Sequence, residues 1–309
     1  MHKIKSILIF LLLLLLLFLF LTNAKATVAC AVNGLNTWFQ NMIPTLFPFM
    51  VLGGLMLRCG YSVKLVKFIK PLLYPLFHMS EDCLYILVMG FLCGFPMGAV
   101  LIEQSMQLSK ISKEEAQYLV SFCNNIGPVY FIGFVLINCP VGQNVLCICM
   151  MYLIPLFYGI ILRYTRYRNS FLEHKSACKT QVMAIGEAFE QSLNAGISSI
   201  TKLGGYMILF NALTILFHNS MITFSPAVTG ILSCVFEISG GILQIQKIGN
   251  LYPFVYSILP IGGFCCLAQT YGILHKNGLS MKQYVFHKGI QTIFTGILYY
   301  GFFLKNVFS

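Results

Sequence analysis

The chain has 309 residues, of which 58% are hydrophobic and only 9% are charged, and its mean hydropathy is +0.80. These proportions exclude a soluble globular domain and leave room for about seven or eight membrane crossings joined by short loops. The net charge of +11 does not indicate a nucleic-acid partner, because the basic residues lie in short patches between apolar segments, as in cytoplasmic loops.

The N-terminus combines a basic start, an apolar run over Ile7–Leu21 and small residues at Asn23–Ala26. A cleaved signal peptide and an uncleaved first helix fit this pattern equally well, and we treat residues 1–35 as one signal or anchor segment. The next predicted crossing is Trp38–Leu57. The basic residues that follow it at helical spacing predict a helix in the cytoplasmic membrane interface (Arg58, Lys64, Lys67 and Lys70).

Two later apolar segments are interrupted by residues that an ordinary membrane helix has no reason to carry. Leu84–Ile102 contains GFPMG at residues 94–98, and Phe122–Ile137 contains NNIGP at residues 124–128. Proline removes a backbone N–H and glycine loosens the helix, so both segments are predicted to be broken helices. Such paired breaks point to a substrate site near the membrane midplane. Between them, Ser112 and two following glutamates predict a capped helix start.

The rest of the chain predicts a second half that is similar to the first. After a crossing at Val145–Leu162, a strongly basic loop predicts a cytoplasmic linker at residues 163–183 between halves at 36–162 and 184–309 (Arg163, Arg166, Arg168, Lys175 and Lys179). Further crossings are predicted at Ile197–Phe217, Ala227–Ile245 and Gly289–Leu304, with another broken segment at Leu251–Leu274. GFPMGA at residues 94–99 and GFCCLA at 263–268 each precede a capped helix, which suggests an internal repeat.

The polar residues inside these segments form the candidate site. Glu237 is the only carboxylate deep inside a crossing, and it is predicted to couple or gate transport. The alternative is a structural tie to Lys202 or to the backbone of a neighbouring helix. The predicted substrate-binding residues supply amide groups or freed backbone at the breaks (Gly94, Pro96, Gly98, Asn124, Asn125, Gly127, Pro128 and Gln269). For the two asparagines, capping of the broken helix ends is an equal alternative.

Two further charged residues are interpreted as interfacial. Glu103 lies at the end of the first broken segment, and Lys202 is placed near a helix start, from which a lysine can extend its ammonium group to the membrane surface.

Several of these motifs together resemble a known family: GFPMGA at residues 94–99, ISKEEA at 111–116, SFCNNIGPVYFIG at 121–133, EISGGI at 237–242 and PIGGFCCLAQTYGIL at 260–274. In this order they are similar to the sporulation integral membrane protein family of the YlbJ type, which carries nucleoside-recognition (Gate) domains. The resemblance covers residues 36–301. It implies a multi-pass protein of the inner membrane of an endospore-forming bacterium, and a core similar to concentrative nucleoside transporters, with two hairpins and two unwound helices around a central site.

The sequence therefore predicts an all-α polytopic membrane protein with two related halves that transports a nucleoside or another small polar metabolite in spore formation. The alternative is a non-transporting scaffold for spore assembly, with sporulation membrane proteins as partners. The cysteines lack zinc or redox spacing and motifs such as HExxH and GxSxG are missing, so we predict no enzyme, metal site or cofactor.

The distribution of basic residues also predicts the topology. A first hairpin at Leu84–Ile102 should enter and leave on the cytoplasmic face, because basic patches both precede and follow it. The same rule applied to the modestly basic stretch after Leu251–Leu274 (His275, Lys276, Lys282 and Lys288) would make a second hairpin there cytoplasmic too, and the halves parallel. The family resemblance instead implies inverted halves, with the second hairpin at Leu251–Leu274 entering from outside, and we predict this inverted arrangement. This arrangement makes Arg166 cytoplasmic and Lys276 external.

Overall fold

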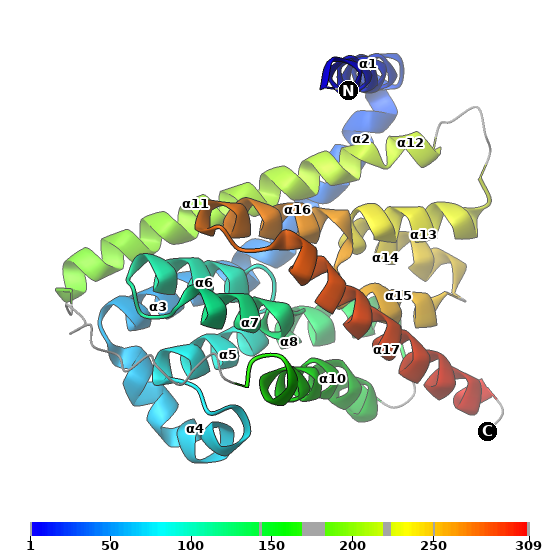
Figure 1. Cartoon of the computed structure of the whole chain (residues 1–309). Coiled ribbons are helices and arrows are strands. Elements are labelled where there is room, and N and C mark those ends of the chain that lie inside the picture. Colours follow the sequence, from blue (N-terminus) through cyan, green and yellow to red (C-terminus); the bar gives the residue numbers. More distant parts are fainter. Residues whose placement is uncertain (1, 142–143, 169–182, 219–223, 250, 308–309) are drawn as a thin grey trace.

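The computed structural model describes residues 2–141, 144–168, 183–218, 224–249 and 251–307, which form helices joined by short connections (Figure 1). Within these residues six helices are long and apolar enough to cross a bilayer, or seven if one bent pair counts as a single span. The prediction of an all-helical, multi-pass membrane protein is confirmed.

The N-terminal helices differ in how they pack. α1 (His2–Thr22) is exposed along its length and lies apart from the other helices in Figure 1. α2 (Ala24–Thr37), the π-helical turn η1 (Trp38–Met42) and α3 (Ile43–Arg58) follow one another as one span. A Cβ atom on Gly34 would lie 2.7 Å from the backbone oxygen of Met207 in α11 (Ile185–Leu213). α2 thus packs closely in the bundle, and the predicted boundary at residue 35 falls inside it.

α4 (Tyr61–Phe77) has the character of the predicted interfacial helix. It is amphipathic, and it is bent by 97° relative to the next helix, α5 (Glu81–Cys93). Lys64 and Lys67 are exposed, whereas Val66 is buried against the other helices. The helix therefore lies across one end of the bundle with its lysines outward.

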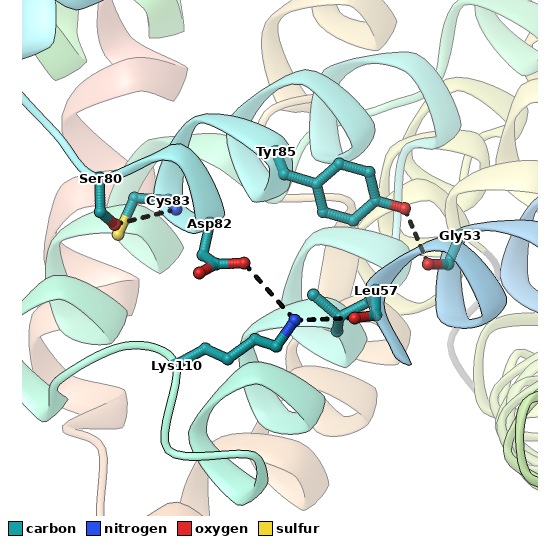
Figure 2. Close-up of polar contacts among 7 residues, drawn as sticks. All are labelled: Gly53, Leu57, Ser80, Asp82, Cys83, Tyr85 and Lys110. Carbon is teal, nitrogen blue, oxygen red and sulfur yellow. Dashed lines mark hydrogen bonds and ion pairs between the residues drawn. The ribbon is translucent and has the colours of Figure 1, made fainter. Parts of the chain in front are cut away.

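α5 and α6 (Met97–Gln107) form an antiparallel pair, the first hairpin. Lys110, just after α6, donates to the backbone oxygen of Leu57 at 2.7 Å and lies 3.7 Å from a carboxylate oxygen of Asp82 at the start of α5 (Figure 2). One turn deeper, the Tyr85 hydroxyl donates to the backbone oxygen of Gly53 at 2.7 Å. Because both ends of the pair lie at the C-terminal end of α3, the chain enters and leaves on one side, as predicted.

A broken span follows the first hairpin. α7 (Lys113–Cys123) begins with the predicted cap, since the Ser112 hydroxyl accepts from the backbone N–H of Glu115 at 3.1 Å and the Glu115 carboxylate accepts from that of Ser112 at 2.8 Å. The helix stops at residues 124–127 and resumes as α8 (Pro128–Tyr130), the π-helical turn η2 (Phe131–Val135) and α9 (Leu136–Asn138). The break predicted at 124–128 is confirmed.

α10 (Asn144–Thr165) returns the chain to the end where α4 lies. The Arg163 guanidinium donates to the backbone oxygen of Phe77 at 2.7 Å, and the Tyr164 hydroxyl donates to that of Pro75 at 3.2 Å. We call this end the basic face (Arg58, Lys64, Lys67, Arg163 and Arg166), and the charge rule predicts that it is the cytoplasmic one. Lys175 and Lys179 of the predicted linker lie outside the described residues.

α11 starts at the basic face and runs antiparallel to α3 and α2. The Arg58 guanidinium donates to the Ser192 hydroxyl at 3.4 Å, and further along the Trp38 indole N–H donates to the backbone oxygen of Ile200 at 2.8 Å. At its far end the short α12 (Ile215–His218) leads away from the basic face (Figure 1).

α13 (Pro226–Phe236) and α14 (Ile238–Ile248) form a second hairpin, so the prediction of one straight crossing at Ala227–Ile245 is wrong. The Ser233 hydroxyl donates to the side-chain oxygen of Gln244 at 2.9 Å, and a Cβ atom on Gly241 would lie 2.3 Å from the backbone nitrogen of Cys234. The chain turns at Glu237, whose backbone is extended. This hairpin begins beside α12, so the two hairpins enter from opposite ends of the bundle (Figure 1).

The last elements are a second broken span, α15 (Tyr252–Ile258) and α16 (Gly263–Leu274), then the 3₁₀ turn η3 (His275–Asn277) and α17 (Met281–Val307). The backbone N–H of Ser280 donates to the side-chain oxygen of Gln117 at 2.6 Å, and Gly278 lines one cavity with Arg166. The loop that holds Lys276 is therefore on the basic face with Arg166, and the prediction that these two residues lie on opposite sides of the membrane is wrong.

The same geometry corrects two related predictions. The hairpin that enters from the far side is α13–α14 and not Leu251–Leu274, which is a broken span. Residues 94–99 form a hairpin turn, whereas residues 263–268 belong to a spanning helix, so the repeat proposed between them joins unlike elements. Both sites carry a glycine-rich break, and local composition does not distinguish a chain that turns back from one that continues.

Candidate functional site

The two hairpin turns and the two helix breaks meet around one cavity of about 60 Å³, the central cavity. Its lining includes residues from each of the four interruptions (Cys93 and Phe95, Ile126 and Gly127, Glu237, and Leu259 and Gly262). Leu203 and Met207 of α11 and Gln269 of α16 are also part of the wall. Four segments that are far apart in the sequence thus place interrupted backbone at one point inside the bundle.

The first hairpin turn packs directly on the break after α7, through glycine. Gly94 has φ +83°, and a Cβ atom there would lie 2.1 Å from the backbone nitrogen of Gly127. A Cβ atom on Gly127 would in turn lie 2.5 Å from the backbone oxygen of Cys93, and one on Gly98 would lie 3.0 Å from that of Cys123. The structure brings the predicted residues Gly94, Gly98 and Gly127 together. Because they have no side chains, the backbone of the hairpin turn can lie against the backbone of the break.

The two prolines of the predicted set lie at the same interruptions. Pro96 precedes the first residue of α6 and lines a second cavity beside the central one. Pro128 is the first residue of α8, where a missing N–H costs no helical hydrogen bond.

Asn124 and Asn125 are buried, and neither lines the central cavity. The Asn124 amide donates to the Thr270 and Tyr284 hydroxyls, both at 3.2 Å. The Asn125 amide donates to the backbone oxygen of Phe122 at 2.5 Å. These contacts tie the break to α16 and α17, so the geometry favours the capping alternative over direct ligand contact for the asparagines.

Lys288 is a buried residue of the site that the sequence analysis missed. Its ammonium group donates to the Asn125 side-chain oxygen at 2.6 Å and lies 5.4 Å from the centre of the Phe95 ring. The side chain is fully buried, and no described carboxylate pairs with it. The available signal was a polar stripe in α17 at helical spacing, all of it buried (Tyr284, Lys288, Gln291 and Thr295).

Glu237 lies at the turn of the second hairpin and caps α14. Its carboxylate accepts from the backbone N–H groups of Ser239 at 3.0 Å and Gly240 at 2.7 Å, and from the Asn211 amide at 2.9 Å. The carboxylate is 2% exposed and lines the central cavity, but it makes no contact with Lys202. The structural tie considered in the sequence analysis exists with Asn211 as the partner.

Gln269 holds an unpartnered acceptor at the boundary between two cavities. Its amide nitrogen contacts the Cys265 sulfur at 3.1 Å, while its side-chain oxygen accepts no hydrogen bond from any described residue. Gln269 lines both the central cavity and the second cavity, and it is 6% exposed. A buried acceptor without a donor carries an energetic cost, which a ligand or a water molecule in the cavity would remove.

The second cavity, which we call the outer cavity, has a volume of about 210 Å³ and shares Leu203 and Gln269 with the central one. It extends along α6 from Pro96 to Glu103 and along α16 from Gln269 to Lys276 of the basic-face loop. Lys202 also lines it. Because α11 begins at Ile185, Lys202 lies well inside this helix, and its predicted place near a helix start is wrong.

We expect Glu237→Gln to lower the thermal unfolding temperature of the purified protein. Both carboxylate oxygens accept N–H groups, so an amide NH₂ in this position would face donors and leave one of them unpaired, at about 1–3 kcal/mol. Differential scanning fluorimetry in detergent measures the change. Glu190→Gln is the control, since that glutamate is exposed on α11. Equal stability of wild type and Glu237→Gln would exclude the capping role.

Comparison with known proteins gives one relative. The chain is 25% identical over 338 aligned positions to the sporulation integral membrane protein YlbJ of Bacillus subtilis (strain 168), and the match covers 96% of this chain and 82% of that protein. No family model matches the chain, and no solved structure is significantly similar to it.

Proposed function

We propose that this chain is a transporter in the bacterial cell membrane for a nucleoside or another small polar metabolite, and that it acts in spore formation. The observation that carries the proposal is the convergence of four helix interruptions on the central cavity, with the unpartnered Gln269 oxygen at its wall. Interrupted helices free backbone groups inside a bilayer, and proteins accept that cost where the backbone surrounds a substrate.

The two hairpins suggest how the site would open. They enter from opposite ends of the bundle and meet at the central cavity, so a movement of either would expose the site to one side only. The central cavity of about 60 Å³ has room for a few water molecules and is too small for a nucleoside. The structure is therefore interpreted as a closed state. This arrangement of hairpins and broken helices is the one expected for a core similar to concentrative nucleoside transporters.

The place in spore formation rests on the similarity to the Bacillus subtilis protein, whose name describes a sporulation integral membrane protein. The rival proposal is a membrane scaffold without transport, with other sporulation membrane proteins as partners. The contacts of the Glu237 carboxylate and of the Asn124 and Asn125 NH₂ groups favour it, because a packed core needs such contacts whether or not a ligand binds. The buried side-chain oxygen of Asn124, in contrast, has no partner among the described residues.

Ligand binding and uptake separate the two proposals. A transporter should show a concentration-dependent rise in unfolding temperature with one class among nucleosides, nucleobases and amino acids, because a ligand that binds only the folded state stabilises it. The same compound should enter liposomes that contain the protein. Gln269→Leu should weaken both responses at least tenfold, since it removes the free acceptor. Absence of any response in folded protein would favour the scaffold.

A further inference from the structure

We propose that the outer cavity binds the anionic group of a small soluble metabolite, with Lys202 and Lys276 as the residues that hold it. The inference rests on the proposed function and narrows its substrate class from polar metabolites in general to organic anions. It starts from the charges that line the cavity, which are two ammonium groups and the one carboxylate of Glu103.

The first observation concerns the position of Lys202, which lies far along α11 from the basic face. Two residues before it, Ile200 accepts the Trp38 indole N–H, and the residue after it, Leu203, lines both cavities. Lys202 is exposed and forms no hydrogen bond or ion pair with a described residue. An ammonium group inside a membrane bundle needs water or an anion beside it, and the Glu103 carboxylate is the one described negative charge for both lysines of the cavity.

Lys276 extends the positive charge from this depth to the basic face. It lies in η3, at the end of α16, and is likewise exposed, with no hydrogen bond or ion pair to a described residue. The charges of both lysines interact at longer range with the Glu103 carboxylate. The outer cavity connects Lys202 to Lys276 over a volume of about 210 Å³, which is larger than the central cavity. The cavity is lined by two lysines and one glutamate, so its net charge is positive. This charge attracts anions to the cavity from the cytoplasmic side.

Gln269 supplies the second requirement on the ligand. Its unpartnered oxygen lies where the outer cavity meets the central one, and only an N–H or O–H donor can satisfy it. A ligand that spans this boundary would place its anionic group between the lysines and a donor group at Gln269. Phosphorylated or carboxylated metabolites with hydroxyl or amino groups meet both conditions, whereas an uncharged nucleoside meets only the second.

The single tryptophan of the chain allows a direct test. Trp38 donates to Ile200, and a Cβ atom on Gly204 would lie 2.4 Å from its ring, so the indole packs on the turn of α11 that carries Lys202. Tryptophan fluorescence is titrated with inorganic phosphate and with a nucleoside 5′-monophosphate, at constant ionic strength, on protein in phosphatidylcholine nanodiscs. Both anions should give a saturable change, and the monophosphate should bind more tightly because it also reaches Gln269.

Charge variants give the expected directions. Lys202→Gln should weaken binding at least tenfold, and Glu103→Gln should tighten it because a negative charge is removed from the cavity. Lys282→Gln is the matched control, since this lysine is exposed on the same face but does not line the cavity, and it should leave the affinity unchanged. If Lys202→Gln fails to fold, the opposite shift in Glu103→Gln still tests the proposal.

The contrary outcomes are distinct. A linear, non-saturating response, or equal losses in Lys202→Gln and Lys282→Gln, would mean only general attraction to a basic surface. Loss of the response when phosphatidylglycerol replaces phosphatidylcholine would assign the cavity to a lipid headgroup phosphate and overturn the soluble ligand. If nucleosides are taken up but no anion binds, the anion site is rejected and the transport function stands. If anions bind but no compound is taken up, the transport function is rejected and the anion site stands.

Discussion

Gly94→Ala should destabilise the protein more than any other single methyl addition near the site, by more than about 4 kcal/mol. The residue has φ +83° and ψ −169°, a conformation that is almost confined to glycine and that costs other residues about 1–3 kcal/mol. Its Cβ atom would also lie 2.1 Å from the backbone nitrogen of Gly127. Because that neighbour is backbone, the first hairpin and the break after α7 would have to separate.

The measurement is the unfolding temperature and the yield of monodisperse protein in detergent. Gly133→Ala is the matched control, because it adds the same methyl group in the broken span against which Gly94 packs, at a position where the added Cβ atom would have no neighbouring group within 4 Å. It should leave the unfolding temperature within a few degrees of wild type. If Gly94→Ala were as stable as Gly133→Ala, the contact between hairpin turn and break would not exist as described.

Lys288→Met should separate stability from activity. The Lys288 ammonium is fully buried, with the side-chain oxygens of Asn125 and Gln291 and two aromatic rings as its neighbours and no described carboxylate. Methionine has nearly the same length and removes the cost of burying the charge, but it leaves the Asn125 oxygen without a donor, a loss of about 1–3 kcal/mol. The two effects oppose each other. We expect an unfolding temperature close to that of wild type, together with at least a tenfold loss of uptake or spore yield.

The expected functional loss follows from the position of Lys288. It contacts Asn125 at the break after α7 and lies over the Phe95 ring at the first hairpin turn, the two elements that must part if the central cavity opens. A buried charge that stability does not require is typical of a functional group in membrane proteins. Lys282→Met, at the exposed start of the same helix, is the control and should retain activity.

Two results would contradict this view of Lys288. Full activity in Lys288→Met would make the lysine dispensable, and a large drop in unfolding temperature would make it a structural anchor for Asn125. Lys288→Ala helps to interpret either result, since it should lower stability by about 2–5 kcal/mol through the cavity it leaves.

The sequence by itself determined the features that depend on local chemistry. Hydropathy identified a multi-pass membrane protein, because only long apolar helices satisfy their backbone groups in lipid. Glycine, proline and asparagine located the interruptions at 94–98 and 124–128, and Ser112 with Glu115 marked the start of α7. Each of these features is decided by residues within a turn or two of one another.

The path of the chain was decided only by the tertiary structure. A break does not specify whether the chain turns back or continues, and for the first hairpin that choice rests on Lys110, which joins Asp82 to Leu57 from distant elements. The turn at Glu237 contains no proline, and the carboxylate that caps it is held by Asn211 of another helix. Lys288 and Lys202 both lie inside long helices, yet one is fully buried and the other is exposed and lines a cavity. Burial and direction depend on which helices pack together, and local sequence does not contain that information.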